Sequence, residues 1–172
     1  RAASAQRPAR TCPAKACSRT AMATGTRPRN HSAWAIPSRA AVWVAHQHQL
    51  GGRPSAARGW LARAERVLAD APPSAGHGWV AVERARQAAT VRDQAEAASR
   101  ALKVARDTGD GDLEVLATSL LGRAAVRAGR REAGWRLLEE AMAAAAAGPV
   151  QDVHTLGEAY CNLLLACTGA QE

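Results

Sequence analysis

The amino-acid sequence predicts an all-α protein made of stacked antiparallel helical hairpins. Hydrophobic residues make up 47% of the 172 residues, but there is no Phe and only one Tyr, and alanine supplies most of the apolar side chains. Small apolar side chains favour close packing of helices over a core filled by aromatic rings. Because sustained apolar-polar alternation and hairpin signals such as Asn-Gly are both absent, we expect no strands. No apolar run approaches the ~18 residues of a membrane-spanning helix.

The first hairpin is predicted from residues 41–50 and 54–70. The pair Gly51-Gly52 ends the first helix, and Pro54 suits the first turn of the second, where its missing N–H group is not needed. Two prolines, Pro72 and Pro73, then close the hairpin. Apolar residues three and four positions apart give the second helix one buried face, formed by Ala57, Leu61, Ala64 and Leu68.

The same order of small, large and small side chains returns after three turns. The turns are Gly52, the pair Arg92-Asp93 and Gly129, which lie 41 and 36 residues apart, and the side chains follow each turn at offsets of five, nine and twelve. A repeat near this period without strands predicts an array of hairpins that bury their faces by stacking. The expected packing residues are Ala57, Leu61, Ala64, Ala98, Leu102, Ala105, Gly134, Leu138 and Ala141.

Stop signals define the later helices. The second hairpin is predicted over 77–90 and 94–107 and ends at Gly109. The third is predicted over 113–128 and 131–147, from Asp112 as a cap to a stop at Gly148.

A final helix near 153–167 has no predicted partner, and residues 169–172 form a short tail. This helix is expected to leave an apolar strip exposed as an interaction surface, and hence to favour self-association. The strip consists of Leu156, Tyr160, Leu163, Leu164 and Cys167.

The net charge of +8 belongs to the N-terminal segment. Eight basic residues precede position 40 and the first acidic residue is Glu65, so the rest of the chain carries 15 basic and 15 acidic residues. Residues 1–38 hold four prolines and no periodic apolar pattern, which predicts a disordered basic segment before the repeats of residues 39–168. Three interpretations stay open: an arm that binds nucleic-acid phosphates, an organelle transit peptide, or a GC-rich gene translated out of frame.

The spacing of cysteine and histidine predicts no metal site. Cys12 and Cys17 form C-x₄-C, but no pair of histidines with zinc-finger spacing follows them. His46 and His48 point to different sides of a helix. The later cysteines, Cys161 and Cys167, are expected to be small buried apolar residues of a reducing, cytoplasmic compartment.

Catalytic signals are equally weak, because the acidic residues suit other roles. Glu139 and Glu140 are adjacent and face different directions, whereas Asp110 and Asp112 suit helix capping. Phosphate-binding, dinucleotide-binding and nucleophile motifs do not occur. We therefore expect no enzymatic activity, no catalytic residue and no cofactor.

Several segments carry a family resemblance. The small-Leu-small signature is similar to tetratricopeptide repeats, although these repeats exceed the usual ~34 residues and lack the Trp-Leu-Gly-Tyr first helix. The segments GRPSAARGWLARAERVL, HGWVAVERAR, ARDTGDGDLEVLATSLLGRAAVRAGR, GWRLLEEAMAAAAAG and EAYCNLLLAC resemble the repeat region of large actinobacterial LuxR-type transcriptional regulators. The resemblance covers residues 39–168.

The resemblance implies a tetratricopeptide-like α-solenoid that acts as a sensory or scaffolding domain. In such regulators a separate helix-turn-helix domain contacts DNA, and no such motif occurs in this chain. We expect a fragment that binds a protein, a peptide or the missing domains of its parent, with no membrane partner. The alternative is nucleic-acid binding through the basic N-terminal segment.

Overall fold

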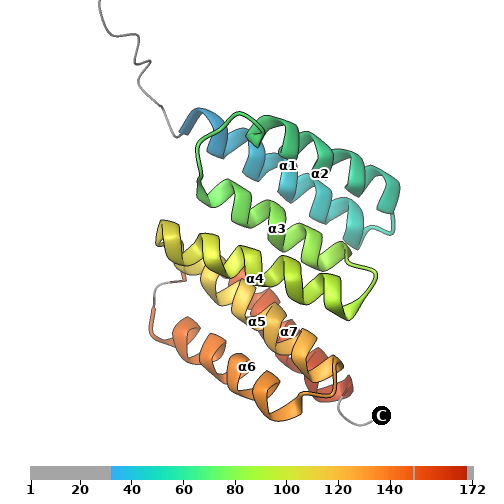
Figure 1. The fold of residues 1–172 in the computed structure, drawn as a ribbon, viewed down its shortest axis with the longest axis vertical. Coiled ribbons are helices and arrows are strands. Elements are labelled where there is room, and N and C mark those ends of the chain that lie inside the picture. Colours follow the sequence, from blue (N-terminus) through green and yellow to red (C-terminus); the bar gives the residue numbers. More distant parts are fainter. Residues whose placement is uncertain (1–31, 149, 170–172) are drawn as a thin grey trace, which may run out of the picture.

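The computed structural model describes residues 32–148 and 150–169, and this part of the chain forms seven α-helices and no strand. Six helices pair into three hairpins, which follow one another along the long axis of the molecule, and the seventh lies beside the fifth (Figure 1). The predicted all-α class is confirmed. The helices are α1 (Ser32–Leu50), α2 (Pro54–Leu68), α3 (Ala75–Gln87), α4 (Val91–Thr108), α5 (Gly111–Arg127), α6 (Arg131–Ala146) and α7 (Val153–Gly169).

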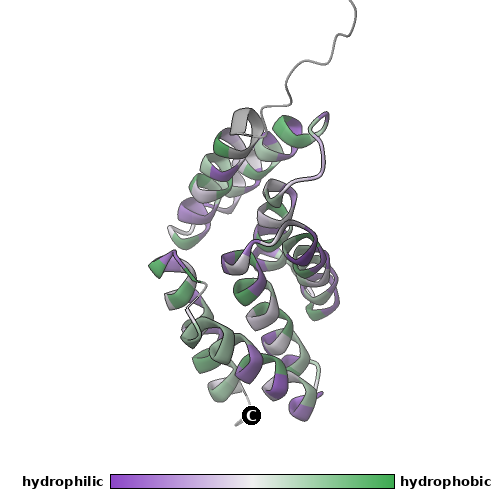
Figure 2. Ribbon diagram, turned by 90° about the vertical axis from the view of Figure 1, so that its left-hand side faces the viewer, coloured by the Kyte–Doolittle hydropathy of each residue, from purple (hydrophilic) through white to green (hydrophobic). Residues whose placement is uncertain are grey.

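The odd-numbered helices form one side of the array. Helix α1 packs on α3, α3 touches α5, and α5 packs on α7, while α2, α4 and α6 complete the hairpins. Figure 2 shows apolar and polar residues interleaved along the helices. In the described part of the chain, no helix combines the length and the apolar character needed to cross a membrane.

Most predicted helix ends are confirmed. Pro54 begins α2 within its first turn. Gly52 and Gly109 both adopt a φ of 68°, the left-handed conformation that glycine takes without strain. These turns set the hairpins at the predicted places.

Helix α1 begins earlier than the sequence predicts. It starts at Ser32 rather than at residue 41, so the last residues of the segment 1–38 are helical and that boundary is wrong. Pro37 lies inside the helix, where it removes one backbone hydrogen bond. Burial of Ser38, Ala41 and Val42 against α2 and α3 outweighs that loss. Residues 1–31, with seven of the eight N-terminal basic residues, lie outside the described part.

Two predicted turn residues have different roles in the structure. Thr90 is the N-cap of α4 and accepts a hydrogen bond from the Asp93 amide at 3.0 Å, so the pair 92–93 belongs to the first helical turn. Asp110, not Asp112, caps α5 by accepting from the Leu113 amide at 3.0 Å. Asp112 instead accepts a hydrogen bond from the Gln151 amide at 2.9 Å, which ties the segment before α7 to the start of α5.

The prediction that the final helix lacks a partner is wrong. Helix α7 packs along α5 and touches α6. Its buried face consists of small or polar residues at helical spacing, which an apolar pattern does not reveal: Thr155, Ala159, Asn162 and Ala166. Asn162 Nδ2 donates a hydrogen bond to the buried Ser119 Oγ of α5 at 3.1 Å, so the interface between α5 and α7 is partly polar.

The predicted strip on α7 is only partly exposed. Leu156 and Leu163 are half-buried, and Leu163 packs against the cluster around Leu138. Tyr160 and Leu164 remain 48% and 63% exposed. Cys161 and Cys167 are both exposed, which contradicts their prediction as buried apolar residues.

The predicted packing residues lie largely in the interior of the array. All nine are buried except Leu102, which is half-buried and packs on the main core cluster. Large residues of α5 complete that core, with Leu113, Leu116 and Leu120 almost fully enclosed. The small residues of the predicted set therefore occupy buried positions on the helices.

Candidate functional site

Two open cavities lie next to each other on the side of the array formed by α1, α3, α5 and α7. The tryptophan cavity, about 380 Å³, is lined by residues that include Ile36, Arg39, Trp43, Trp79, His46 and His154. The leucine cavity, about 600 Å³, is lined by residues that include Leu50, Leu120, Arg123, Val153, Asn162 and Leu165. His46, Arg86 and His154 border both cavities. The stacking of alternate helices therefore builds one continuous candidate site.

A network of charged side chains crosses the floor of this site. Glu83 of α3 is fully buried and accepts hydrogen bonds from Arg86 Nη1 and Gln87 Nε2, each at 2.9 Å. Arg86 also donates through Nε to Glu158 Oε1 at 2.6 Å and through Nη2 to the second oxygen of Glu158. This two-pronged contact connects α3 to α7.

Both central groups of the network are held in their charged forms. Burial by itself raises the pKa of the Glu83 carboxyl, but His46, Arg86 and Gln87 together outweigh burial and lower that pKa. Burial lowers the pKa of Arg86, and the carboxylates of Glu158 and Glu83 outweigh it and raise that pKa. Because each buried charge depends on its partners, removal of one partner is expected to destabilise the others.

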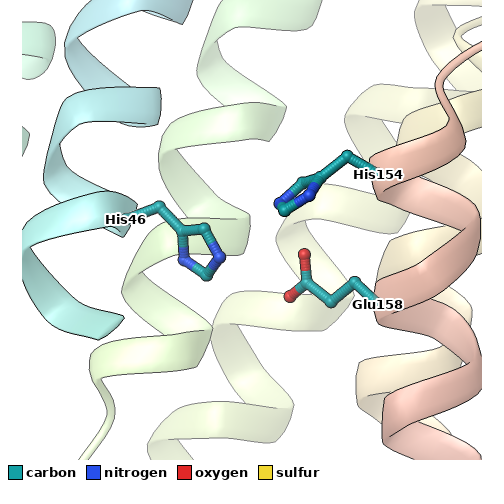
Figure 3. A group of neighbouring side chains, drawn as sticks. All are labelled: His46, His154 and Glu158. Atoms are coloured by element: carbon teal, nitrogen blue, oxygen red, sulfur yellow. The ribbon is translucent and has the colours of Figure 1, made fainter. Parts of the chain in front are cut away.

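Two histidines meet above this network. The ring of His154 packs edge-on against Trp43, with centroids 4.6 Å apart, and lies 5.8 Å from the ring of His46. Figure 3 shows both rings and the Glu158 carboxylate pointing toward one another from α1 and α7. Their ligand atoms all lie within 4.8 Å of one another.

The nitrogens of these histidines are incompletely satisfied in the described structure. His46 Nδ1 lies 3.4 Å from Glu83 Oε2, outside hydrogen-bond geometry, and His154 Nε2 is buried with no hydrogen-bond partner. A buried imidazole nitrogen without a partner costs free energy. Chemically, the two imidazoles and the carboxylate offer the donor types that transition-metal ions bind.

The wall of the tryptophan cavity is fixed by polar contacts at the edge and at one face of the Trp79 ring. Trp79 Nε1 donates to Asp110 Oδ2 at 3.0 Å, so the cap of α5 also orients this indole. The Arg39 guanidinium lies 4.4 Å from the centre of the Trp79 ring and 3.8 Å from Asp152. These contacts hold a preformed aromatic surface next to the opening.

The residues singled out from the sequence lie mostly elsewhere. The packing residues sit between helices, and Tyr160 and Leu164 do not line either cavity. Glu140 lies 3.9 Å from Arg106 on a different part of the surface.

Sequence reasoning missed the histidine cluster because it considered only ligands close together in the chain. His46 and His154 come from the first and last helices of the described array. The available signal was the spacing of His154 and Glu158, which are four residues apart and hence share one helix face.

No protein-family model matches the chain, and the searches of curated proteins and of solved structures found no match.

Proposed function

We propose that this chain is a non-enzymatic helical repeat scaffold that binds a segment of another protein along the side formed by α1, α3, α5 and α7. The observation that carries the proposal is the pair of adjoining cavities on that side. Their rims expose large apolar side chains from both ends of the array: Ile36, Trp43, Leu50, Val153 and Leu165. A contiguous apolar surface of this kind favours binding of another molecule.

The positive charge of Arg123 indicates which chemical group the partner carries. Arg123 lines the leucine cavity and donates to the neutral Asn162 Oδ1 at 3.3 Å, but it makes no ion pair within the described residues. Burial, and then the neighbouring Arg127, lower the pKa of Arg123, while Glu158 partly offsets them. A carboxylate in the cavity would favour the charged guanidinium. The proposed partner segment therefore carries large apolar side chains and an acidic group.

The cellular role follows from the resemblance rather than from the cavities. Segments within residues 39–168 resemble the repeats of LuxR-type transcriptional regulators, and on that basis we place the chain in the cytoplasm as part of such a regulator. DNA would be contacted by a domain outside this chain. The apolar and acidic partner segment then belongs to a signalling protein or to another domain of the parent.

A selection from a random peptide library displayed on phage tests the proposal with the full chain as bait. We expect enriched peptides to combine aromatic or aliphatic residues with Asp, Glu or a free carboxyl end. Binding should weaken about tenfold or more in Trp43→Ala, because aromatic anchors at interfaces typically contribute ~2 kcal/mol or more. Arg123→Glu should weaken the acidic peptides selectively.

Trp60→Ala is the matched control. Trp60 is 36% exposed on α2, compared with 47% for Trp43, and it lines neither cavity. Equal loss in the two tryptophan variants would show that the peptides bind elsewhere. A selection without enrichment would count against a peptide-binding scaffold.

A further inference from the structure

We propose that His46, His154 and Glu158 form a binding site for one divalent transition-metal ion, of which Zn²⁺ fits best, and that this ion joins α1 to α7. The three ligand atoms lie within 4.8 Å of one another, and the side chains point toward a shared centre (Figure 3). The inference goes beyond the proposed scaffold function and does not rest on it.

The donor set favours Zn²⁺ over the hard cations. Two imidazole nitrogens and one carboxylate oxygen are ligands that zinc accepts in tetrahedral sites, with a fourth position left for water. Ca²⁺ and Mg²⁺ instead require mostly oxygen ligands. His46 is only 7% exposed, and the unpartnered His154 Nε2 is buried, so a bound ion would satisfy a nitrogen that otherwise lacks a partner.

The groups behind the ligands match the support that metal sites require. Glu83 Oε2 lies 3.4 Å from His46 Nδ1, and Figure 3 shows the other ring nitrogen of His46 on the side of His154 and Glu158. A carboxylate behind a ligating imidazole fixes the tautomer and orients the ring. Arg86 holds Glu158 by both oxygens, which fixes that carboxylate and leaves about two of its roughly four lone-pair positions for a metal.

An ion at this place would act as a cross-link between distant parts of the chain. Within the described residues, the backbones of α1 and α7 do not pack against each other. Side chains connect this part of the chain to α1: the Trp43 ring packs on His154 of α7, and Arg39 pairs with Asp152, the residue just before α7. Metal ligands from both helices would fix their separation, and with it the width of the two cavities.

Calorimetric titration of the full chain with Zn²⁺ tests the site. The four cysteines are first replaced by serine, because free thiolates bind zinc on their own. We expect one ion per chain and a higher melting temperature. His154→Ala and Glu158→Gln should each weaken binding at least tenfold, and Glu83→Gln should weaken it about 10- to 100-fold, as loss of supporting groups typically does.

His48→Ala is the matched control, because His48 lies on the same helix as His46 and outside the cluster. Its zinc affinity should equal that of the parent. Circular dichroism checks that each variant keeps its helices; because His154 is half-buried, its replacement is the variant expected to fold normally. Equal zinc affinity in His154→Ala and the parent would overturn the site, as would a parent that binds no zinc.

A second readout identifies the ligands without relying on stability. Co²⁺ in place of Zn²⁺ should give the visible absorption bands of a tetrahedral nitrogen and oxygen site, and these bands should disappear in His154→Ala. An octahedral spectrum, or bands that persist in that variant, would overturn the assignment. Peptide binding by the metal-free chain is measured separately, so that failure of the metal site and failure of the scaffold function are distinguished.

Discussion

Gly122 of α5 and Gly134 of α6 face each other where the backbones of the third hairpin come closest. A Cβ added at Gly122 would lie 2.9 Å from the Gly134 carbonyl oxygen, and one added at Gly134 would lie 2.8 Å from the Gly122 carbonyl oxygen. Such distances leave no room for a methyl group. The hairpin therefore requires glycine at both positions for steric reasons.

Gly122→Ala should accordingly destabilise the protein, although alanine is the better helix former. We expect the free energy of unfolding to fall by about 1 to 3 kcal/mol, as overpacking typically costs, and chemical denaturation measures it. Gly59→Ala is the control, because an added Cβ there meets nothing within 4 Å. That variant should gain roughly 0.5 to 1 kcal/mol. A neutral Gly122→Ala would disprove the close approach of α5 and α6.

At the scale of elements, α7 carries two kinds of exposed apolar residue: some line a cavity and others do not. Leu165 lines the leucine cavity, whereas Leu164 and Tyr160 are exposed and line neither cavity. Its contact with α5 uses mainly small and polar residues, and Leu163 packs on the cluster around Leu138. The side chains of Tyr160, Leu164 and Leu165 stay exposed. The neighbouring residues Leu164 and Leu165 therefore belong to two different exposed apolar surfaces.

We expect the chain to self-associate through the surface around Leu164, since exposed leucine and tyrosine side chains lose contact with water on association. Leu164→Glu should shift the sedimentation profile toward monomer at high protein concentration. Leu165→Glu is the matched comparison and should leave association unchanged. If Leu165→Glu dissociates the protein instead, association occurs through the cavity side. A parent that stays monomeric at high concentration would contradict the prediction.

At the scale of the whole molecule, the start of α1 sets the smallest unit expected to fold. Seven basic residues precede Ser32, and the chain from Ser32 onward carries 16 basic and 15 acidic residues. Any general attraction to nucleic-acid phosphates should therefore come from residues 1–31. The fold, in contrast, depends on the N-terminal turns of α1, which contain the buried Ser38.

A chain shortened to begin at Ser32 should keep the melting temperature of the full chain and lose any affinity for DNA that falls steeply with salt. A chain that begins at residue 41 should melt at a lower temperature, because it lacks two turns of α1. Thermal melts and DNA titrations at two salt concentrations measure both effects. Steep salt-dependent DNA binding by the chain from Ser32 would favour the nucleic-acid alternative over the scaffold.

The sequence by itself determined the helical class, the glycine turns at Gly52, Gly109 and Gly129, and the buried small-large-small faces. These features depend on local causes: glycine at left-handed turns, proline in a first helical turn, and a 3.6-residue period that places Ala57, Leu61 and Ala64 on one side. The start of α1 was missed because Pro37 is a strong local stop signal, and burial against α2 and α3 overrides it.

Only the tertiary structure decided which helix packs against the buried face of α7. It also decided which residues come together in the candidate site. The face of α7 that packs on α5 consists of small and polar residues, so its burial depends on matching partners such as Ser119 rather than on an apolar pattern. His46, Glu83 and Glu158 come from three helices and meet because the hairpins stack with a particular offset and rotation and because α7 packs on α5. That geometry arises from side-chain packing between hairpins, which residue spacing along the chain does not encode.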